Sequence, residues 1–476
     1  MTPESHQPSD AFSFLGLCDL ARLRGEGKVT AREVVQSCLD RIDLLNGRSK
    51  AFISLDREGA LAQAKACDQS SSGETSPLRG LPYGVKDLFD VAGQVTTAGS
   101  KVFADRIADE DAESVARLRR AGGICLGKLN LHEFAYGATG ENQLYGTPVN
   151  AYDHTRLAGG SSSGSAAAVA FGLIPAALGT DTGGSVRAPA ALNGLVGLKP
   201  TLGLISLRGV VPYSWSLDHA GCITRSAADA ALLLSALAGH DPLDPASADV
   251  EPQDYACALT PDGSLEGVTL GVPRAFYFER CDPEILAASE AVLAHLERRG
   301  ARLRDVELPS MERARSVSLT IQMPEALSYH MPHLEARGEL YSEEFRAGLA
   351  LGQCILAEHY LRARRMLTRY RQQVDRVFEE VDALLTPATP VIAPLLGSVK
   401  VGTGKDAEPV GNAITRYTTF FNMTGHPAMT LPSGLHGSGL PMGVQLVARH
   451  FDEALLFRLA SCIEGERAFA VPPPSL

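Results

Sequence analysis

The sequence predicts an α/β fold, and two observations support this prediction. Between residues 159 and 240, runs of small residues typical of close-packed helices alternate with apolar strands and glycine turns, which is the pattern of a layered α/β architecture. The chain also has 476 residues, of which 45% are hydrophobic, so it can bury a large core. We expect a single domain over residues 1–476 with a helical excursion, rather than the three domains that its length alone would allow.

Residues 12–75 are predicted to form N-terminal helices. Thr30 and Glu33 have the spacing of a capping box, in which two side chains bond backbone N–H groups at the start of a helix. Apolar residues then recur on one helical face: Val34, Val35, Cys38, Ile42 and Leu45. The polar run at residues 69–78 is expected to be a loop.

The core of the predicted domain spans residues 76–240. Turn-forming residues bound its first apolar run, which indicates a short strand. The elements expected before the serine-rich segments are a strand at 80–87, a helix at 113–121 and a strand at 123–126.

Residues 241–380 are predicted to leave the sheet, and residues 381–470 to return to it. The stretch at 241–266 is acidic and contains prolines, which is typical of a surface linker. The remaining expected elements are helices at 284–300 and 355–380, a strand running into a proline turn at 383–394, a strand at 442–447 and a helix at 452–465.

The net charge and the cysteine content indicate which binding partners and which cellular compartment to expect. The formal net charge is −11, which argues against nucleic acid as the main partner. Nine scattered cysteines without a CxxC pair suit reduced thiols in the cytoplasm. The polar N-terminus lacks a signal-peptide hydrophobic region, and the longest apolar stretch, at 166–178, is broken by Gly172 and Pro175. We therefore expect a cytoplasmic protein with no membrane span.

Two segments rich in serine and glycine are the most informative part of the chain. One reads GGSSSGSAAAVAFG over residues 159–172, and the other reads GTDTGGSVRAPA over residues 179–190. Each places a serine after two glycines, at Ser161 and at Ser185. A hydroxyl on such a turn, beside free backbone N–H groups, provides what a nucleophile and an oxyanion hole require.

Other interpretations of the glycine-rich segments explain less. A flexible linker would not run directly into a close-packing helix start. A phosphate-binding loop at residues 122–129 would need Ser or Thr where Leu129 stands, so a strand followed by a turn fits better. A nucleophile elbow would centre on Ser162 and use an acid and a histidine such as Asp382 and His426, but it leaves the second segment without a role.

A metal site is not expected. His330 and His333 have HxxH spacing, which could present two ligands on one helical face. No third ligand signal lies nearby, and the alternative interpretation is a half-exposed helix surface.

Lys86 is the candidate base for these serines. Histidine is the usual base, but no histidine of this chain has comparable glycine-framed, apolar flanks. Lys86 lies in PYGVKDLFDV at the end of an apolar strand, where burial would lower its pKa and leave a neutral amine. The alternative is an ordinary strand-end lysine. A serine–lysine dyad with SxxK spacing is excluded because no lysine has a serine three residues before it.

Together these segments resemble the amidase signature family. The similarity extends over about residues 12–465 and is found in the following motifs: GVKD, KLNLHEFAYGATGENQLYG, GGSSSGSAAAVA, GTDTGGSVRAPAA, GLVGLKPT, SLDHAGCITRS, LLTPATPVIAP and GLPMGVQLVARHFDE. Ser163 stands where the family usually has glycine, which is expected to narrow the turn without disturbing the chemistry. The resemblance implies a large mixed β-sheet covered by helices on both faces, an α/β/α sandwich.

The resemblance also implies a role for each motif residue. Ser185 matches the acylated nucleophile, and Ser161 matches a bridging serine held on a cis peptide bond after Gly160. Lys86 matches the lysine that completes the relay. Backbone N–H groups of the 182–185 turn are expected to form the oxyanion hole, with Thr182, Gly183 and Gly184 as its residues.

The surroundings of this site are expected to bind the substrate without a cofactor. The loop at residues 134–141 is predicted to line the pocket, and the substrate contacts are assigned to Tyr136, Gly137, Thr139 and Ser162. Asp181 and Arg187 flank the nucleophile turn and are expected to pair. The alternative is that Arg187 binds a substrate carboxylate.

The expected activity is hydrolysis of the C–N bond of a small or aryl amide. Carbamates, carbamoyl or biuret-type compounds and esters share the same acyl-enzyme chemistry. The alternative is the glutaminase component of the glutamine-dependent aminoacyl-tRNA amidotransferase, its A subunit, which passes ammonia to a partner, although residues 325–370 look more like stand-alone amidases. A non-catalytic binding protein is the third hypothesis, and intact Lys86, Ser161 and Ser185 argue against it. A small-molecule amide is the expected partner, and the sequence does not decide between a monomer and a homodimer.

Overall fold

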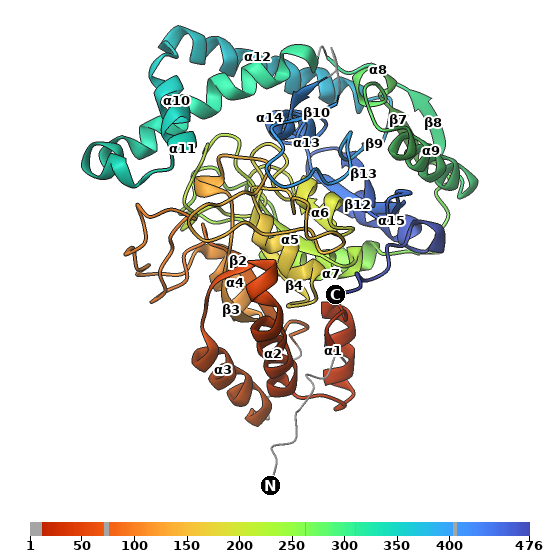
Figure 1. Ribbon diagram of the computed structural model, residues 1–476. Helices are drawn as coiled ribbons and strands as arrows, with labels where there is room; N and C mark the ends of the chain where they lie inside the picture. The colour runs from red at the N-terminus through yellow and green to blue at the C-terminus, as the bar shows by residue number, and fades with distance from the viewer. Residues whose placement is uncertain (1–11, 71–75, 262, 310, 403–406) are drawn as a thin grey trace.

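The fold is built around one large mixed sheet. The computed structural model describes residues 12–70, 76–261, 263–309, 311–402 and 407–476. Within these residues eleven strands form a sheet in the order β1-β3-β2-β4-β6-β5-β12-β13-β9-β7-β8 (Figure 1). They are β1 (Phe52–Leu55), β2 (Pro82–Lys86), β3 (Ile124–Leu129), β4 (Ala176–Thr180), β5 (Val196–Lys199), β6 (Ala220–Thr224), β7 (Thr269–Val272), β8 (Arg302–Asp305), β9 (Ala383–Pro387), β12 (Ala428–Leu435) and β13 (Pro441–Ala448). A separate pair is β10 (Lys400–Val401) with β11 (Glu408–Pro409).

The sheet joins the two halves of the chain. β2 runs parallel to both β3 and β4, and β7 runs parallel to both β8 and β9. Between these groups the pairings are antiparallel, and β5 pairs with β12, aligning Lys199 with Ala428. The parallel pairing of β2 and β4 places their carboxyl ends at the same edge of the sheet, and both serine-rich segments adjoin β4.

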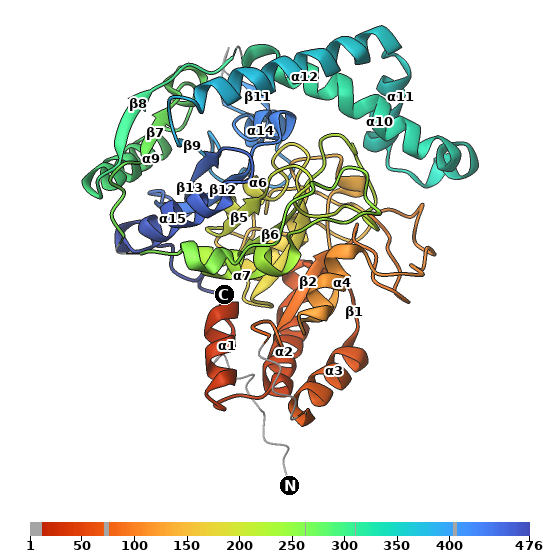
Figure 2. The same ribbon diagram turned by 180° about the vertical axis from the view of Figure 1, so that it is seen from behind.

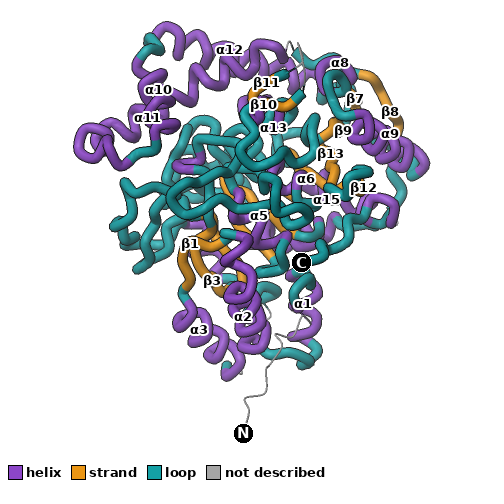
Figure 3. Tube along the Cα trace, viewed as in Figure 1, coloured by secondary structure: helices purple, strands orange, loops and turns teal. Residues whose placement is uncertain are grey.

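Helices cover both faces of the sheet (Figure 3). In β4, Ala176 and Leu178 pack into a core cluster with α7, whereas Ala177 packs into another cluster with α2 and α5, as the alternation of a strand requires. The predicted α/β fold with helices on both faces is confirmed. The helices are α1 (Leu17–Gly25), α2 (Ala31–Ser49), α3 (Arg57–Gln69), α4 (Glu113–Arg120), α5 (Ser163–Ala170), α6 (Arg187–Leu192), α7 (Ala227–Leu237), α8 (Arg274–Tyr277), α9 (Pro283–Arg298), α10 (Ala314–Arg337), α11 (Glu343–Gln353), α12 (Ala357–Val377), α13 (Val410–Ile414), α14 (Thr419–Thr424) and α15 (Glu453–Glu464).

Most elements expected from the sequence are present, but the prediction that residues 241–380 leave the sheet is wrong, because β7 and β8 are two of its strands. Thr30 and Glu33 form the predicted capping box at the start of α2. The polar loop predicted at residues 69–78 falls partly on residues 71–75, which lie outside the described residues. The linker predicted at 241–266 is partly packed rather than wholly superficial, because Tyr255 is buried and its ring lies 5.8 Å from that of Phe457.

A helical layer stands away from the N-terminal helices. α11 and α12 both pack against α10, and the three helices extend across one end of the molecule, opposite α1, α2 and α3 (Figures 1 and 2). In the part of the chain that the structure describes, no helix has the length and apolar content needed to cross a membrane.

Candidate active site

The ends of two parallel strands bring a lysine, a serine and a threonine together. Lys86 ends β2 and Thr180 ends β4, the strand beside it. The Lys86 Nζ lies 2.7 Å from the Ser161 Oγ and 2.8 Å from the Thr180 Oγ1, and all three side chains are buried. Burial lowers the pKa of Lys86 to about 7, against the opposing charges of Asp218 and Asp181. Much of this amine is therefore neutral at neutral pH and can accept a proton.

The backbone around Ser161 is fixed by the loop that precedes it. The Gly160–Ser161 peptide bond is cis, as the resemblance implies. The Gly160 N–H donates to the Ala138 carbonyl at 2.7 Å, and the His132 N–H donates to the Ser161 carbonyl at 3.2 Å. The loop at residues 132–140 and the first serine-rich segment therefore form one unit.

Small residues of the first segment are required by close packing. α5 begins directly after Ser162, and its residues are all buried. A Cβ on Gly164 would lie 2.4 Å from the Asn130 backbone nitrogen, which only glycine avoids. Ser163, the departure from the family pattern, lies in the first turn of α5 and donates its hydroxyl to the Gly140 carbonyl at 3.1 Å.

Ser185 lies where the second segment meets a cavity. The Ser162 N–H donates to the Ser185 carbonyl at 3.2 Å, which ties the two segments together. The Ser185 residue is 7% exposed and lines a cavity of about 510 Å³ together with Thr182 and Gly183. Lys86 and Ser161 are not among the lining residues. The nucleophile candidate therefore faces the cavity, and the buried lysine and serine do not.

A buried ion pair holds the turn before Ser185. The Arg187 Nη2 lies 2.8 Å from the Asp181 Oδ1, and both side chains are fully buried. Arg187 also donates to Gln445 at 2.6 Å and to Asn422 at 2.7 Å. Burial acts to raise the pKa of Asp181, but the Arg187 guanidinium holds that pKa below its usual value. The predicted pairing is confirmed, and the alternative of Arg187 as a substrate-carboxylate ligand is wrong because its guanidinium is already engaged.

The predicted oxyanion hole needs one correction. The Gly184 N–H donates to the Asp181 Oδ1 at 2.8 Å, so it is committed to the turn itself. Among the described residues, the N–H groups of Thr182, Gly183 and Ser185 have no such acceptor. The candidate donors of an oxyanion hole are therefore these three N–H groups, without Gly184.

Three of the four predicted substrate contacts reach the cavity. Tyr136, Gly137 and Thr139 line it. Ser162 does not, because its hydroxyl is fully buried and donates to the Thr180 carbonyl at 3.2 Å. Ser162 therefore stabilises the backbone behind the cavity, and its predicted contact with the substrate is wrong.

The alternative motifs are not assembled into sites. Ser162, Asp382 and His426 do not meet, since Asp382 accepts from the Thr269 N–H and His426 faces Asp375. In the segment resembling a phosphate loop, the Lys128 Nζ is buried 2.6 Å from the Asp87 carboxylate.

One histidine of the HxxH pair is more deeply buried than expected. His330 is fully buried, and its Nδ1 lies 2.9 Å from the Tyr341 hydroxyl. His333 packs edge-on against Phe103. The expected half-exposed helix surface is therefore wrong for His330, which belongs to an aromatic core.

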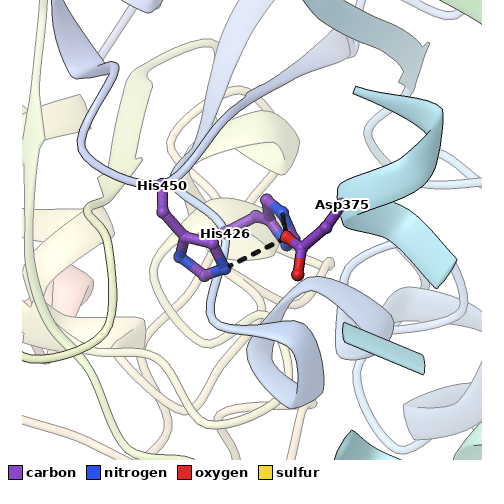
Figure 4. Close-up of side chains that lie close together, drawn as sticks. All are labelled: Asp375, His426 and His450. Carbon is purple, nitrogen blue, oxygen red and sulfur yellow. Dashed lines mark ion pairs between the residues drawn. The ribbon is translucent and has the colours of Figure 1, made fainter. Parts of the chain in front are cut away.

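One cluster among the described residues has ligand atoms close enough for a metal ion. Asp375, His426 and His450 place their ligand atoms within 4.8 Å of one another (Figure 4). Burial lowers the pKa of His426, and the neighbouring Lys199 and Arg371 add to this effect against Asp375. The charge of the Arg371 guanidinium also opposes a divalent cation. None of the three residues lines the cavity, so the cluster is separate from Ser185.

The comparison with known proteins identifies the family. The family model described as Amidase matches residues 33–457. The chain belongs to the amidase family. The A subunit of the glutamyl-tRNA(Gln) amidotransferase of Chromohalobacter salexigens is 39% identical over 93% of this chain and 95% of its own length.

Solved structures of amidase-family proteins share the fold. A chain from a vestigial protein complex, described as revealing the evolutionary origins of an s-triazine catabolic enzyme, is 35% identical with a TM-score of 0.92, covering 96% of this chain and 100% of its own. A peptide amidase in complex with the competitive inhibitor chymostatin is 31% identical with a TM-score of 0.85, covering 97% and 99%. The amidase fold is therefore shown, and the family is one of amide-hydrolysing enzymes.

The sequence did not indicate the positions of two side chains that lie near the serines or their cavity. Thr180 lies in the motif GTDTGG and contacts Lys86. Its place in the motif, two residues before Thr182, does not indicate where its side chain points. Arg315 lines the cavity from the first turn of α10, and no sequence motif marks it.

Proposed function

We propose that this chain is an amidase that cleaves the C–N bond of a small amide through an acyl-enzyme on Ser185. The observation that supports the proposal most strongly is the 2.7 Å distance between the Lys86 Nζ and the Ser161 Oγ. This pair is buried behind the turn that presents Ser185 to the cavity. Under this proposal Ser185 is the nucleophile, Ser161 is the relay and Lys86 is the neutral base.

The first step forms the bond between Ser185 and the substrate. Neutral Lys86 accepts the proton of the Ser161 hydroxyl, while the Ser161 oxygen takes the proton of the Ser185 hydroxyl. The Ser185 Oγ attacks the carbonyl carbon, and the carbonyl π electrons move onto the oxygen. The result is a tetrahedral intermediate with one negative oxygen and a protonated Lys86.

Backbone donors stabilise that oxygen. The N–H groups of Thr182, Gly183 and Ser185 are the available donors of the turn. Each such donor typically contributes about 2.7–4 kcal/mol to stabilisation of the transition state. The Asp181 carboxylate sets the shape of the turn before the substrate arrives, so the donors need no rearrangement.

Breakdown reverses the proton path. Lys86 returns its proton through Ser161 to the leaving nitrogen, the C–N bond breaks, and the amine departs. Water then attacks the acyl-enzyme and gives up a proton along the same relay. The acid is released, and Ser185 regains its hydroxyl proton. Apart from the substrate and one water molecule, the proposed steps use side chains and backbone groups of this chain.

Turnover of a panel of amides by the purified chain tests this function. We expect hydrolysis of at least one aliphatic amide, anilide or carbamate without any added partner protein. Ser185→Ala should abolish it, and Ser162→Ala should retain it, because the Ser162 hydroxyl bonds the Thr180 carbonyl outside the cavity. Equal turnover by wild type and Ser185→Ala would overturn the proposal.

A glutaminase that works within a larger complex is the second candidate function. The 39% identity to the A subunit of a glutamyl-tRNA(Gln) amidotransferase supports it. Under that function, turnover would be confined to glutamine and would depend on partner proteins. Hydrolysis of simple amides by the isolated chain favours the stand-alone amidase, whereas glutamine turnover that appears only with partners favours the glutaminase.

A further inference from the structure

The cavity beside Ser185 contains one cation without a counter-charge. Four of its lining residues carry charged or titratable groups other than tyrosine: His132, Glu141, Glu344 and Arg315. The His132 Nε2 lies 3.5 Å from the Glu344 carboxylate, and the Glu141 carboxylate accepts the Gly397 N–H at 3.0 Å. Among the described residues, no carboxylate lies within 4 Å of the Arg315 guanidinium. Arg315 therefore has no charged partner, whereas His132 and Glu344 lie beside each other.

Arg315 is tied to the nucleophile turn by threonines. Its Nη1 donates to the Thr415 Oγ1 at 3.2 Å. The hydroxyls of Thr418 and Thr419 lie 2.7 Å and 3.1 Å from the Gly183 carbonyl, and both also lie within hydrogen-bond distance of the Thr415 carbonyl. Thr415 therefore contacts the guanidinium through its hydroxyl, and through its carbonyl it contacts the threonines beside the turn that carries Ser185.

The Arg315 guanidinium is charged and largely buried, which favours binding of an anion. Burial lowers the pKa of Arg315, and the nearby Tyr213 and Tyr136 hydroxyls oppose this shift, but a guanidinium stays charged in proteins. Water in an open cavity can solvate it. A substrate that displaces this water would leave the cation unsolvated unless the substrate supplies an acceptor of its own. A carboxylate fits the planar fork of arginine with two parallel hydrogen bonds.

We infer that Arg315 binds a carboxylate of the substrate, so that the substrate class of this site is amides that also carry a carboxylate. The inference rests on the proposed function, because it assigns a substrate to the cavity in which Ser185 is the nucleophile. Arg187 cannot take this role, since Asp181, Gln445 and Asn422 already occupy its donors. Arg315 is a specificity residue, and it takes no part in the proton transfers.

Matched pairs of amides test this inference. Each pair consists of the monoamide of a dicarboxylic acid and the neutral diamide of the same acid, for chains of three to six carbons. Wild-type kcat/KM, corrected for the two amides of the diamide, should favour the monoamide by at least about 10-fold for one chain length. Arg315→Gln should remove this preference mainly through KM, and Arg315→Lys should restore part of it.

Arg337→Gln is the matched control. Arg337 ends the same helix and pairs with the exposed Asp105, and it does not line the cavity. This variant should keep the wild-type preference. Calorimetry with the corresponding dicarboxylates gives a second readout that needs no turnover: wild type and Arg337→Gln should bind them about 10-fold more tightly than Arg315→Gln does.

The outcomes separate the two proposals. Hydrolysis of both members of every pair without preference, or a preference that survives Arg315→Gln, would overturn the carboxylate site and leave the amidase. Dicarboxylate binding that depends on Arg315, without hydrolysis of any amide, would support the anion site and overturn the proposed function. Failure of every dicarboxylate to bind, with no preference in turnover, would overturn the inference.

Discussion

The Gly184 N–H donates to the Asp181 carboxylate at 2.8 Å inside the turn that carries Ser185. The same carboxylate accepts the N–H groups of Val186 and Arg187 at 3.1 Å and 3.2 Å. One buried anion therefore organises three backbone donors, and the Arg187 guanidinium compensates its charge. These bonds fix the backbone of the turn, and they leave Thr182, Gly183 and Ser185 as the donors proposed for the oxyanion hole.

Removing the charge of Asp181 should destabilise the fold. Asp181→Asn leaves the Arg187 guanidinium buried without its counter-ion, which typically costs about 3–5 kcal/mol. Urea unfolding should show a lower midpoint, and turnover should fall with the loss of the turn's shape. Asp105→Asn, at the exposed pair with Arg337, is the control and should change the midpoint little. An unchanged midpoint for Asp181→Asn would contradict this account.

Gly184 should not tolerate a side chain. Its φ is +129°, and a Cβ would lie 2.0 Å from the Thr418 Oγ1. Gly184→Ala should therefore cost at least about 1–3 kcal/mol through backbone strain alone and reduce turnover by displacing Ser185. Gly47→Ala in α2 meets nothing within 4 Å and should stabilise the protein by about 0.5–1 kcal/mol. Urea unfolding of the two variants should shift in opposite directions, and a shared direction would count against the close packing described here.

Lys86 should be essential for turnover. Lys86→Ala removes the proton acceptor, and loss of a general base typically lowers the rate about 10²–10⁴-fold. The measurement is kcat/KM, with circular dichroism to show that the fold persists. Lys101→Ala removes an exposed lysine and should retain wild-type activity. Near-normal turnover by Lys86→Ala would exclude the lysine as the base.

The pH profile should report the same amine. Burial lowers the pKa of Lys86 to about 7, and only the neutral form accepts a proton from Ser161. As pH falls through that pKa the amine becomes charged, so kcat/KM should fall on the acidic side with an apparent pKa near 7. Activity should rise and level off above it. An acidic limb near pH 4, the range of an ordinary carboxyl group, would point to a different base.

The sequence motifs predicted which residues lie close together better than they predicted the hydrogen-bond partners of those residues. Lys86, Ser161 and Ser185 stand in motifs whose glycines and apolar flanks indicate tight turns and burial, and the structure places Lys86 and Ser161 in contact. Ser162 and Gly184 stand in the same motifs, yet their hydrogen bonds go to Thr180 and Asp181. A motif fixes which residues share a turn, but the direction of each N–H and hydroxyl depends on backbone angles that the motif does not display.

Long-range contacts account for what the sequence could not predict. Arg187 meets Asn422 and Gln445 only because β5 pairs with β12 and β12 pairs with β13. Arg315 reaches the cavity because α10 packs against α14. His330 is buried because Phe134 and Tyr341 surround its ring. Except for the contact of His330 with Tyr341, each of these contacts joins residues more than a dozen positions apart in the sequence. Local sequence patterns carry no information about residue pairs at such separations.

Covalent labelling tests the central claim most directly. A sulfonyl fluoride transfers its sulfonyl group to an activated serine hydroxyl and releases fluoride, and peptide mass spectrometry then locates the adduct. The account predicts one adduct, on Ser185, that is absent from Ser185→Ala and retained in Ser162→Ala. An adduct on Ser162 or Ser161, or an adduct that persists in Ser185→Ala, would contradict the assignment of Ser185 as the nucleophile.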